Sequence, residues 1–215
     1  MRMLTRTLAC MAILMIACGT LLAAQHQAPA VAMTKGSGVI TPMQHDAKLK
    51  TIFTNLGSKT AAYDSGNGWL VMGSANALYG YSQDIAMPFT PKKGATATEI
   101  KIALTYDASG TNGATVALYS DASGLPGKSM KSVNVKNLPT FGDCCTVVVA
   151  KLGKGVKLGK KQYWVVGTTS AKTAATVDVW NYVYGDATGN FAFQQSGGGW
   201  NAYDSTLCAY GVFGK

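Results

Sequence analysis

The sequence predicts an all-β protein, a single-domain sandwich of two antiparallel sheets of the jelly-roll type. Short apolar segments recur along the chain at intervals of roughly 8–15 residues, and Gly, Asn, Asp and Pro separate them. No segment has the 3.6-residue periodicity of an amphipathic helix. Roughly 185 residues follow the apolar N-terminus, which is enough for one domain with a sizeable core.

Residues 1–30 are expected to be a signal peptide. Two arginines among the first six residues precede an apolar segment that ends at Ala24, and Ala28-Pro29-Ala30 matches the A-x-A cleavage pattern. Cleavage after Ala24 and a retained membrane anchor are the alternatives, and Cys18 offers a site for an N-terminal lipid anchor. No later apolar segment is long enough to cross a bilayer. We therefore expect an exported protein, extracellular or at the cell surface, with no transmembrane segment in the mature chain.

The remainder divides into a leader and a folded domain. Residues 31–48 are polar and aperiodic and are expected to form a flexible leader, and residues 49–215 are expected to form the β-sandwich domain. The clearest strand is 98–106, in which Ile100, Ile102, Leu104 and Tyr106 share one face, and Glu99, Lys101 and Thr105 share the other. The next strand contains Val116 and Leu118, and the others are expected at 51–55, 69–73, 85–90, 132–136, 146–152, 162–169, 176–184, 191–194 and 207–213.

A short motif marks the turns between these strands. Asp-Ala-Ser-Gly occurs at 107–110 and 121–124, and Asp-Ala-Thr-Gly occurs at 186–189. An Asp side chain accepts a hydrogen bond from the backbone two residues on, and Gly tolerates a positive φ. Because the strands between the three copies differ in length and pattern, we interpret them as turns of one domain and not as a solenoid repeat.

Five segments in order carry a resemblance to a known family. They are GTNGATVALYSDASGLPG (110–127), LPTFGDCC (138–145), QYWVV (162–166), VDVWNY (177–182) and AYGVFGK (209–215). Together they resemble the choice-of-anchor R domain of exported bacterial proteins, over roughly residues 50–215. The resemblance implies export and supplies no catalytic residues. The chain lacks the C-terminal PEP-CTERM sorting tail of many such proteins, so release or N-terminal lipid tethering is expected instead.

The composition argues against catalysis. Beyond residue 30 the chain has one histidine (His45), one glutamate (Glu99) and no arginine. A nucleophilic hydrolase needs a base beside its Ser or Cys, and His45 lies in the leader. We therefore expect no enzymatic activity and a structural or adhesive role at the cell exterior. A glycoside hydrolase with paired aspartates is the third function considered, after the carbohydrate-binding module described below.

All positive charge beyond residue 30 is lysine, which leaves a net charge of about +7. Lysines at 151, 154, 157, 160 and 161, in KLGKGVKLGKK, are expected to form a basic loop or hairpin. This segment is interpreted either as a solvated turn or as a patch with salt-dependent attraction to polysaccharide or another anionic cell-surface polymer. No specific nucleic-acid partner is expected, because arginine, the commonest base-reading side chain, is missing.

Residues 176–184 suggest a second binding surface. Trp180, Tyr182 and Tyr184 share one face of the expected strand about 7 Å apart, a spacing at which flat rings stack on successive sugar rings. Trp200, in a glycine-rich loop, would extend this platform. The two interpretations are a carbohydrate-binding module and the inner face of one sheet.

Cys144, Cys145 and Cys208 follow the signal peptide, and three cysteines in an oxidising compartment predict one disulfide and one free thiol. Neighbouring side chains on a strand point to opposite faces, so one of Cys144 and Cys145 is expected to pair with Cys208. A bridge between Cys144 and Cys145 is the alternative.

We expect the protein to need no cofactor. A bound Ca²⁺ ion is the alternative. Ca²⁺ prefers the oxygen ligands of exported β-sandwich loops. Such ligands are offered by Asp107, Asn112, Asp121 and Asp186.

Overall fold

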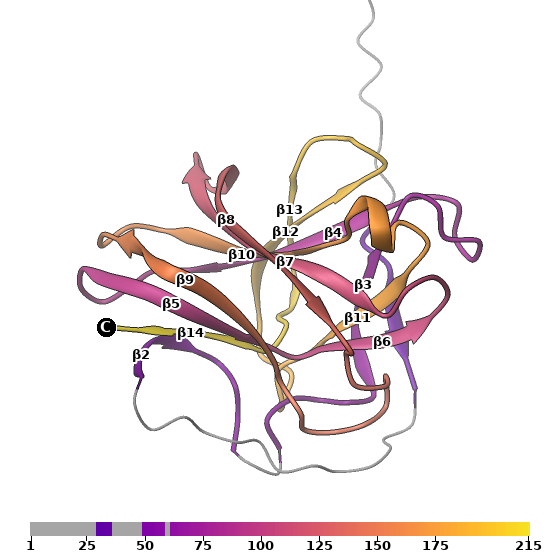
Figure 1. The fold of residues 1–215 in the computed structure, drawn as a ribbon, viewed down its shortest axis with the longest axis horizontal. Helices are drawn as coiled ribbons and strands as arrows, with labels where there is room; N and C mark the ends of the chain where they lie inside the picture. Colours follow the sequence, from indigo (N-terminus) through magenta and orange to yellow (C-terminus); the bar gives the residue numbers. More distant parts are fainter. Residues whose placement is uncertain (1–28, 36–48, 59–60) are drawn as a thin grey trace, which may run out of the picture.

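The structure, a computed structural model, describes residues 29–35, 49–58 and 61–215. Within these residues it is a sandwich of two antiparallel sheets, with one short 3-10 turn, η1 (Ala171–Thr173), as its helical element (Figure 1). The all-β, two-sheet class expected from the sequence is confirmed. None of the described helical residues forms a segment long and apolar enough to span a membrane.

The strands are numbered along the chain. They are β1 (Ala32–Thr34), β2 (Lys50–Thr54), β3 (Asn67–Met72), β4 (Gln83–Phe89), β5 (Ala95–Ile102), β6 (Leu104–Ala108), β7 (Gly113–Ala122), β8 (Leu125–Lys136), β9 (Val148–Leu158), β10 (Tyr163–Thr168), β11 (Val177–Asn181), β12 (Thr188–Gln195), β13 (Asn201–Thr206) and β14 (Tyr210–Gly214).

The smaller sheet has the order β2-β14-β5-β9, so β9 and β2 are its edges. The larger sheet follows the path β6-β11-β3-β4-β10-β7-β8, to which the β12–β13 hairpin is joined through β4. Strand β1 pairs with β3, which places Ala32 opposite Trp69. Residues 32–34 therefore form a strand, and the expectation that they belong to a flexible leader is wrong for these residues. The expected signal peptide, the rest of the leader and His45 lie almost wholly outside the described residues.

The segment expected as one strand at 98–106 belongs to both sheets. Its first part is β5 in the smaller sheet, its last part is β6 in the larger sheet, and Ala103 lies between them. The Ala103 N–H donates to the Ala209 carbonyl at 3.1 Å, and the Ala103 carbonyl accepts from the Asn181 N–H at 2.8 Å. The sandwich is thus closed at this corner by continuous chain. The inward positions are as expected, because Ile100, Ile102 and Leu104 are fully buried.

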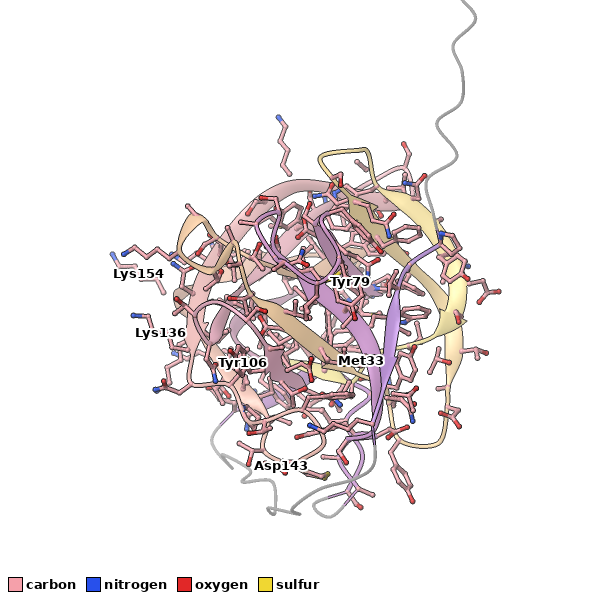
Figure 2. The ribbon with its side chains drawn as sticks, turned by 90° about the vertical axis from the view of Figure 1, so that its right-hand side faces the viewer. Met33, Tyr79, Tyr106, Lys136, Asp143 and Lys154 are labelled. Atoms are coloured by element: carbon pink, nitrogen blue, oxygen red, sulfur yellow. A yellow bond between two sulfur atoms is a disulfide. The ribbon has the colours of Figure 1, made fainter. Side chains whose placement is uncertain are left out.

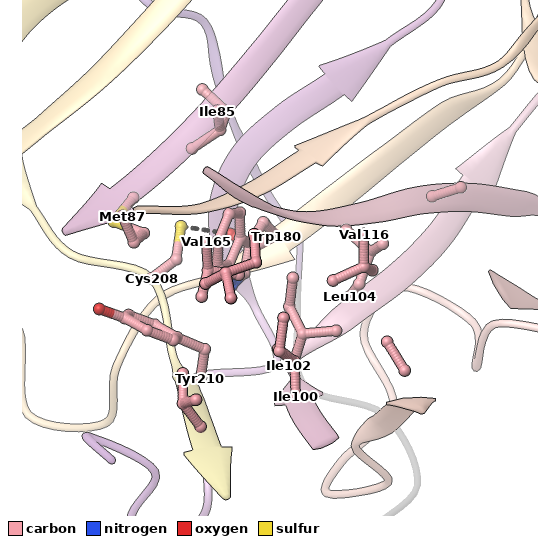
Figure 3. Close-up of a cluster of buried hydrophobic side chains, with 14 of the residues drawn as sticks. Ile85, Met87, Ile100, Ile102, Leu104, Val116, Val165, Trp180, Cys208 and Tyr210 are labelled. Carbon is pink, nitrogen blue, oxygen red and sulfur yellow. Dashed lines mark hydrogen bonds between the residues drawn. The ribbon is translucent and has the colours of Figure 1, made fainter. Parts of the chain in front are cut away.

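The main core fills the space between the two sheets. Figure 3 shows Ile102 from the smaller sheet facing Val165 and Trp180 from the larger one, with Tyr210 beside them. A second cluster covers the other side of β3 and β11 and contains Leu70, Met72, Phe141, Val177 and Val179. Strand β11 is therefore buried on both faces.

Candidate functional site

The lysines expected to form a basic patch lie at the edge of the smaller sheet. We call Lys151, Lys154 and Lys157 of β9, together with Lys160 and Lys161 of the following loop, the lysine row. All five side chains are exposed. Figure 2 shows Lys154 projecting from the same side of the molecule as Lys136 of β8, the neighbouring edge of the larger sheet. The segment is an edge strand, so the expectation of a loop or hairpin is wrong for 151–158.

Lys151 and Lys157 of β9 lie on the outer face of the smaller sheet, and Lys154 lies in a bulge between them. Lys157 lies opposite Thr96, and Lys151 lies opposite Glu99. Between these pairs the register shifts, which leaves residues 152–155 outside the ladder. Gly153 and Gly155 have φ values of +67° and +87°, which favour glycine. In a regular strand, residues three apart point to opposite faces, and the bulge removes this alternation.

One acidic side chain lies beside the lysine row on β5, and its charge is already compensated. Glu99 forms an ion pair with Lys101, with Nζ and Oε1 3.7 Å apart, and both side chains are buried. The Lys101 ammonium also lies 5.2 Å from the centre of the Phe213 ring. Glu99 is therefore held by its own partner, whereas Lys161, at the other end of the row, helps to lower the pKa of the Asp121 carboxyl.

The aromatic row of 176–184 does not form a platform. Trp180 is fully buried, and its Nε1 donates to the Ala209 carbonyl at 3.0 Å. Tyr182 is half-buried and packs edge-on against Trp69, whereas Tyr184 is 64% exposed. Trp200 is half-buried and packs edge-on against Tyr119. For Trp180, the interpretation as the inner face of a sheet is therefore correct.

The cysteine pairing differs from the preferred expectation. Cys144 and Cys145 form a disulfide with each other, and Cys208 is a buried free thiol. The expectation of a bridge from Cys208 to Cys144 or Cys145 is therefore wrong. The structure contains the alternative bridge, between Cys144 and Cys145. The physical reason is the alternation of side chains before β14. Ala209 packs in the cluster that contains Cys144 and Cys145, so Cys208 points the other way, into the main core, and donates to the Trp180 carbonyl at 3.0 Å (Figure 3).

This arrangement predicts the reactivity of the three cysteines. Non-reducing peptide mapping is expected to find Cys144 and Cys145 linked within one peptide. Cys208 is expected to react with iodoacetamide only after unfolding, because burial raises the pKa of its thiol well above the usual value and excludes the reagent. A peptide that contains Cys208 joined to either of the other two would contradict the pairing.

Two of the candidate calcium ligands are occupied by hydrogen bonds that fix loops. The Asp121 carboxylate accepts from Trp164 Nε1 at 2.8 Å, from Gln162 Nε2 at 2.9 Å and from the Gly124 N–H at 3.1 Å. Partial desolvation raises the pKa of Asp121, but these bonds outweigh it and the pKa is lowered overall. The Asn112 amide both donates to and accepts from the Leu138 backbone.

The other two candidates, Asp107 and Asp186, belong to no cluster of acidic, histidine or cysteine side chains in the described part of the chain. Over the described ranges, no three His, Cys, Asp or Glu side chains gather into a group that could hold a metal ion. The motif at 186–189 also differs from its two counterparts, since Asp186 itself has a φ of +53° and the Thr-Gly pair begins β12. Ca²⁺ binding stays a prediction.

Sequence reasoning missed a buried carboxylate in β11. Asp178 is fully buried, and neither carboxylate oxygen has a hydrogen-bond partner among the described residues. Burial raises the pKa of Asp178 to about 8. The signal was present in the sequence, because a single acid lies inside the apolar segment Val177-Asp178-Val179-Trp180.

A second missed feature is a cavity of about 540 Å³ that we call the lysine cavity. It lies where β2 begins, where the chain turns from β4 into β5, and beyond the end of β14. Four lysines line it, Lys50, Lys92, Lys93 and Lys215. The Lys92-Lys93 pair before Gly94 is visible in the sequence, but the other two lysines join it only through strand pairing.

No family model matches the chain, and neither a curated protein nor a solved structure shows significant similarity to it. The resemblance to the choice-of-anchor R domain therefore stays a prediction.

Proposed function

We propose that this is an exported, non-catalytic adhesive protein that binds acidic polysaccharide at the cell exterior through its lysine row. The observation that carries the proposal is the bulge in β9. It contains Lys154 and lies between Lys151 and Lys157, and all three side chains are exposed, as are those of Lys160 and Lys161 just after the strand. Glu99, the nearest acid in the strand pairing, is already held by Lys101.

The chemistry of lysine suits this partner. An ammonium is a compact, hydrated charge on a flexible stem, so it follows a polymer whose charges are irregularly spaced. It lacks the planar fork with which arginine grips one carboxylate or phosphate in two parallel bonds. The lysine row therefore supports attraction to a charged chain with little sequence selectivity. Trp180 is buried, so we do not propose a carbohydrate platform built on it.

A pair of charge-removing substitutions tests the proposal. Lys154→Gln with Lys157→Gln is expected to weaken retention of the protein on immobilised alginate severalfold at low salt, because two of the five charges of the row are lost. The matched control is Lys35→Gln with Lys172→Gln, which removes the same charge from two exposed lysines near β1 and in η1.

The experiment also varies the salt concentration and the immobilised polymer. Retention of the unaltered protein is expected to fall steeply between low and high salt, since exposed charges are screened over about 8 Å at physiological ionic strength. Equal losses in the two double variants would show that net charge alone causes retention, which would overturn the role of the lysine row. Retention on neutral cellulose that resists salt would also overturn it, in favour of aromatic stacking.

A further inference from the structure

We propose that the lysine cavity is a binding site for one acidic sugar unit that carries at least two negative charges. This inference deepens the proposed adhesive function. None of the lysines that line the cavity belongs to the lysine row, so the two can be tested separately. The volume of about 540 Å³ lies within the range of about 300–1,000 Å³ typical of small-molecule sites.

Backbone pairing holds the cavity together from segments that are distant in the sequence. Lys215 and Thr96 exchange two backbone hydrogen bonds, each 3.0 Å long. Gly214 lies opposite Lys50, which brings the start of β2 to the same place. Ala95 lies opposite Leu158 of β9 and anchors the turn that carries Lys92 and Lys93. Strand pairing thus positions Lys50 and Lys215, and the short connection from β4 to β5 positions Lys92 and Lys93.

The charge of the cavity is one-sided. Its lining contains four lysines and no Asp or Glu side chain. Ammonium groups that converge on one space repel one another, and an anion that enters the space relieves this repulsion. A ligand with two or more negative charges gains more than a single small anion, because it interacts with several of the lysines at once.

The rest of the lining indicates a sugar ring. Ile52 and Ala95 offer apolar surface, and Thr51 offers a hydroxyl group. The faces of a sugar ring pack on apolar side chains while its hydroxyls and acidic substituents reach polar partners at the rim. Inorganic phosphate uses only the charges, whereas an acidic sugar uses the whole lining.

The position of the cavity explains how it serves a polymer. Thr96 lies between Lys157 of β9 on one side and Lys215 on the other. Adjacent strands are about 4.8 Å apart, so the backbones of Lys157 in the lysine row and Lys215 in the cavity lining lie roughly 10 Å from each other. The cavity is therefore placed to hold one unit of the chain whose neighbouring units lie along the lysine row. At the left of Figure 1, the C-terminus, the start of β5 and the end of β9 lie together.

The test uses the sulfated disaccharide of chondroitin sulfate, which carries one carboxylate and one sulfate. Titration into the ¹⁵N-labelled protein is expected to shift the Gly94 amide resonance saturably, since Gly94 lines the cavity. Lys92→Gln with Lys93→Gln is expected to weaken this binding roughly tenfold or more, through loss of two close charges. The matched control is Lys128→Gln with Lys131→Gln, two exposed lysines of β8 that belong neither to the cavity lining nor to the lysine row, and it is expected to change the affinity less than about twofold.

The outcomes separate the cavity from the lysine row. An equal loss of disaccharide affinity in both double variants, or no shift of the Gly94 resonance, would overturn the cavity as a binding site. The result of the alginate experiment would not be affected. Tighter binding of inorganic triphosphate than of the disaccharide would overturn the sugar as ligand class. The reverse order, together with weaker binding of the unsulfated disaccharide, is the expected result. If the Lys92/Lys93 variant keeps its affinity for the disaccharide while the Lys154/Lys157 variant loses its retention on alginate, the lysine row is a binding surface and the cavity is not.

Discussion

Replacement of Trp180 by alanine is expected to lower the free energy of unfolding by about 4 kcal/mol. The indole is fully buried, packs edge-on against Tyr210 with ring centres 5.9 Å apart, and donates its N–H to the Ala209 carbonyl. Truncation removes the ring, opens a cavity between the two sheets and removes one of the two hydrogen bonds that the Ala209 carbonyl accepts. Urea unfolding followed by circular dichroism measures the loss.

The matched control is Tyr184→Ala, three residues beyond the end of β11. Tyr184 is 64% exposed, so its removal is expected to change the stability by less than about 0.5 kcal/mol. If Trp180→Ala unfolds at the same urea concentration as the unaltered protein, the residue is not a core residue. A loss of glycan binding without loss of stability would restore the platform hypothesis.

Replacement of Asp178 by asparagine is expected to stabilise the protein at alkaline pH by up to about 5 kcal/mol. The folded protein holds this carboxyl in its neutral form up to a pKa of about 8, whereas the unfolded chain ionises it near its ordinary value of about 3.9. Between these values the folded state binds more protons than the unfolded state. The free energy of unfolding therefore falls as the pH rises from about 4 to about 8, by up to ~1.4 kcal/mol per pH unit.

Unfolding of both proteins at pH 5, 7 and 9 measures this difference. The asparagine variant lacks the titrating group, so its stability is expected to change less across this range. Asp204→Asn, in the exposed part of β13, is the control and is expected to keep the pH dependence of the unaltered protein. Parallel pH profiles for the Asp178 variant and the unaltered protein would falsify the assignment of this buried charge.

The fold class and the burial of individual strand residues could be predicted from the short-range pattern of apolar residues in the sequence. Ile100, Ile102 and Leu104 recur at every second position, and all three lie in the core as expected. The transfer of this segment between sheets at Ala103 could not be predicted, because the alternation continues unchanged through the corner. The pattern also could not show that β11 is covered on both sides, since that depends on β1 and on the chain around Phe141.

The candidate sites also differ in whether the local sequence reveals them. The lysine row is local in the sequence and was predicted from its spacing, although the bulge that contains Lys154 was not. The lysine cavity needs Lys50 and Lys215 to meet through the pairing of β2 with β14, which no local pattern reveals. The cysteine pairing failed for a related reason, because Cys208 and Ala209 point into different clusters.

The position of β14 has a consequence for synthesis of the protein. This strand is the last in the sequence, yet it lies inside the smaller sheet between β2 and β5 and supplies Tyr210 and Val212 to the core. The ribosome needs roughly 10–40 s to complete a chain of this length. Strands β2 and β5 emerge early and wait for most of that time without the partner that joins them. The smaller sheet closes only after β14 has left the ribosome, so a nascent chain arrested before residue 210 is expected to remain sensitive to protease.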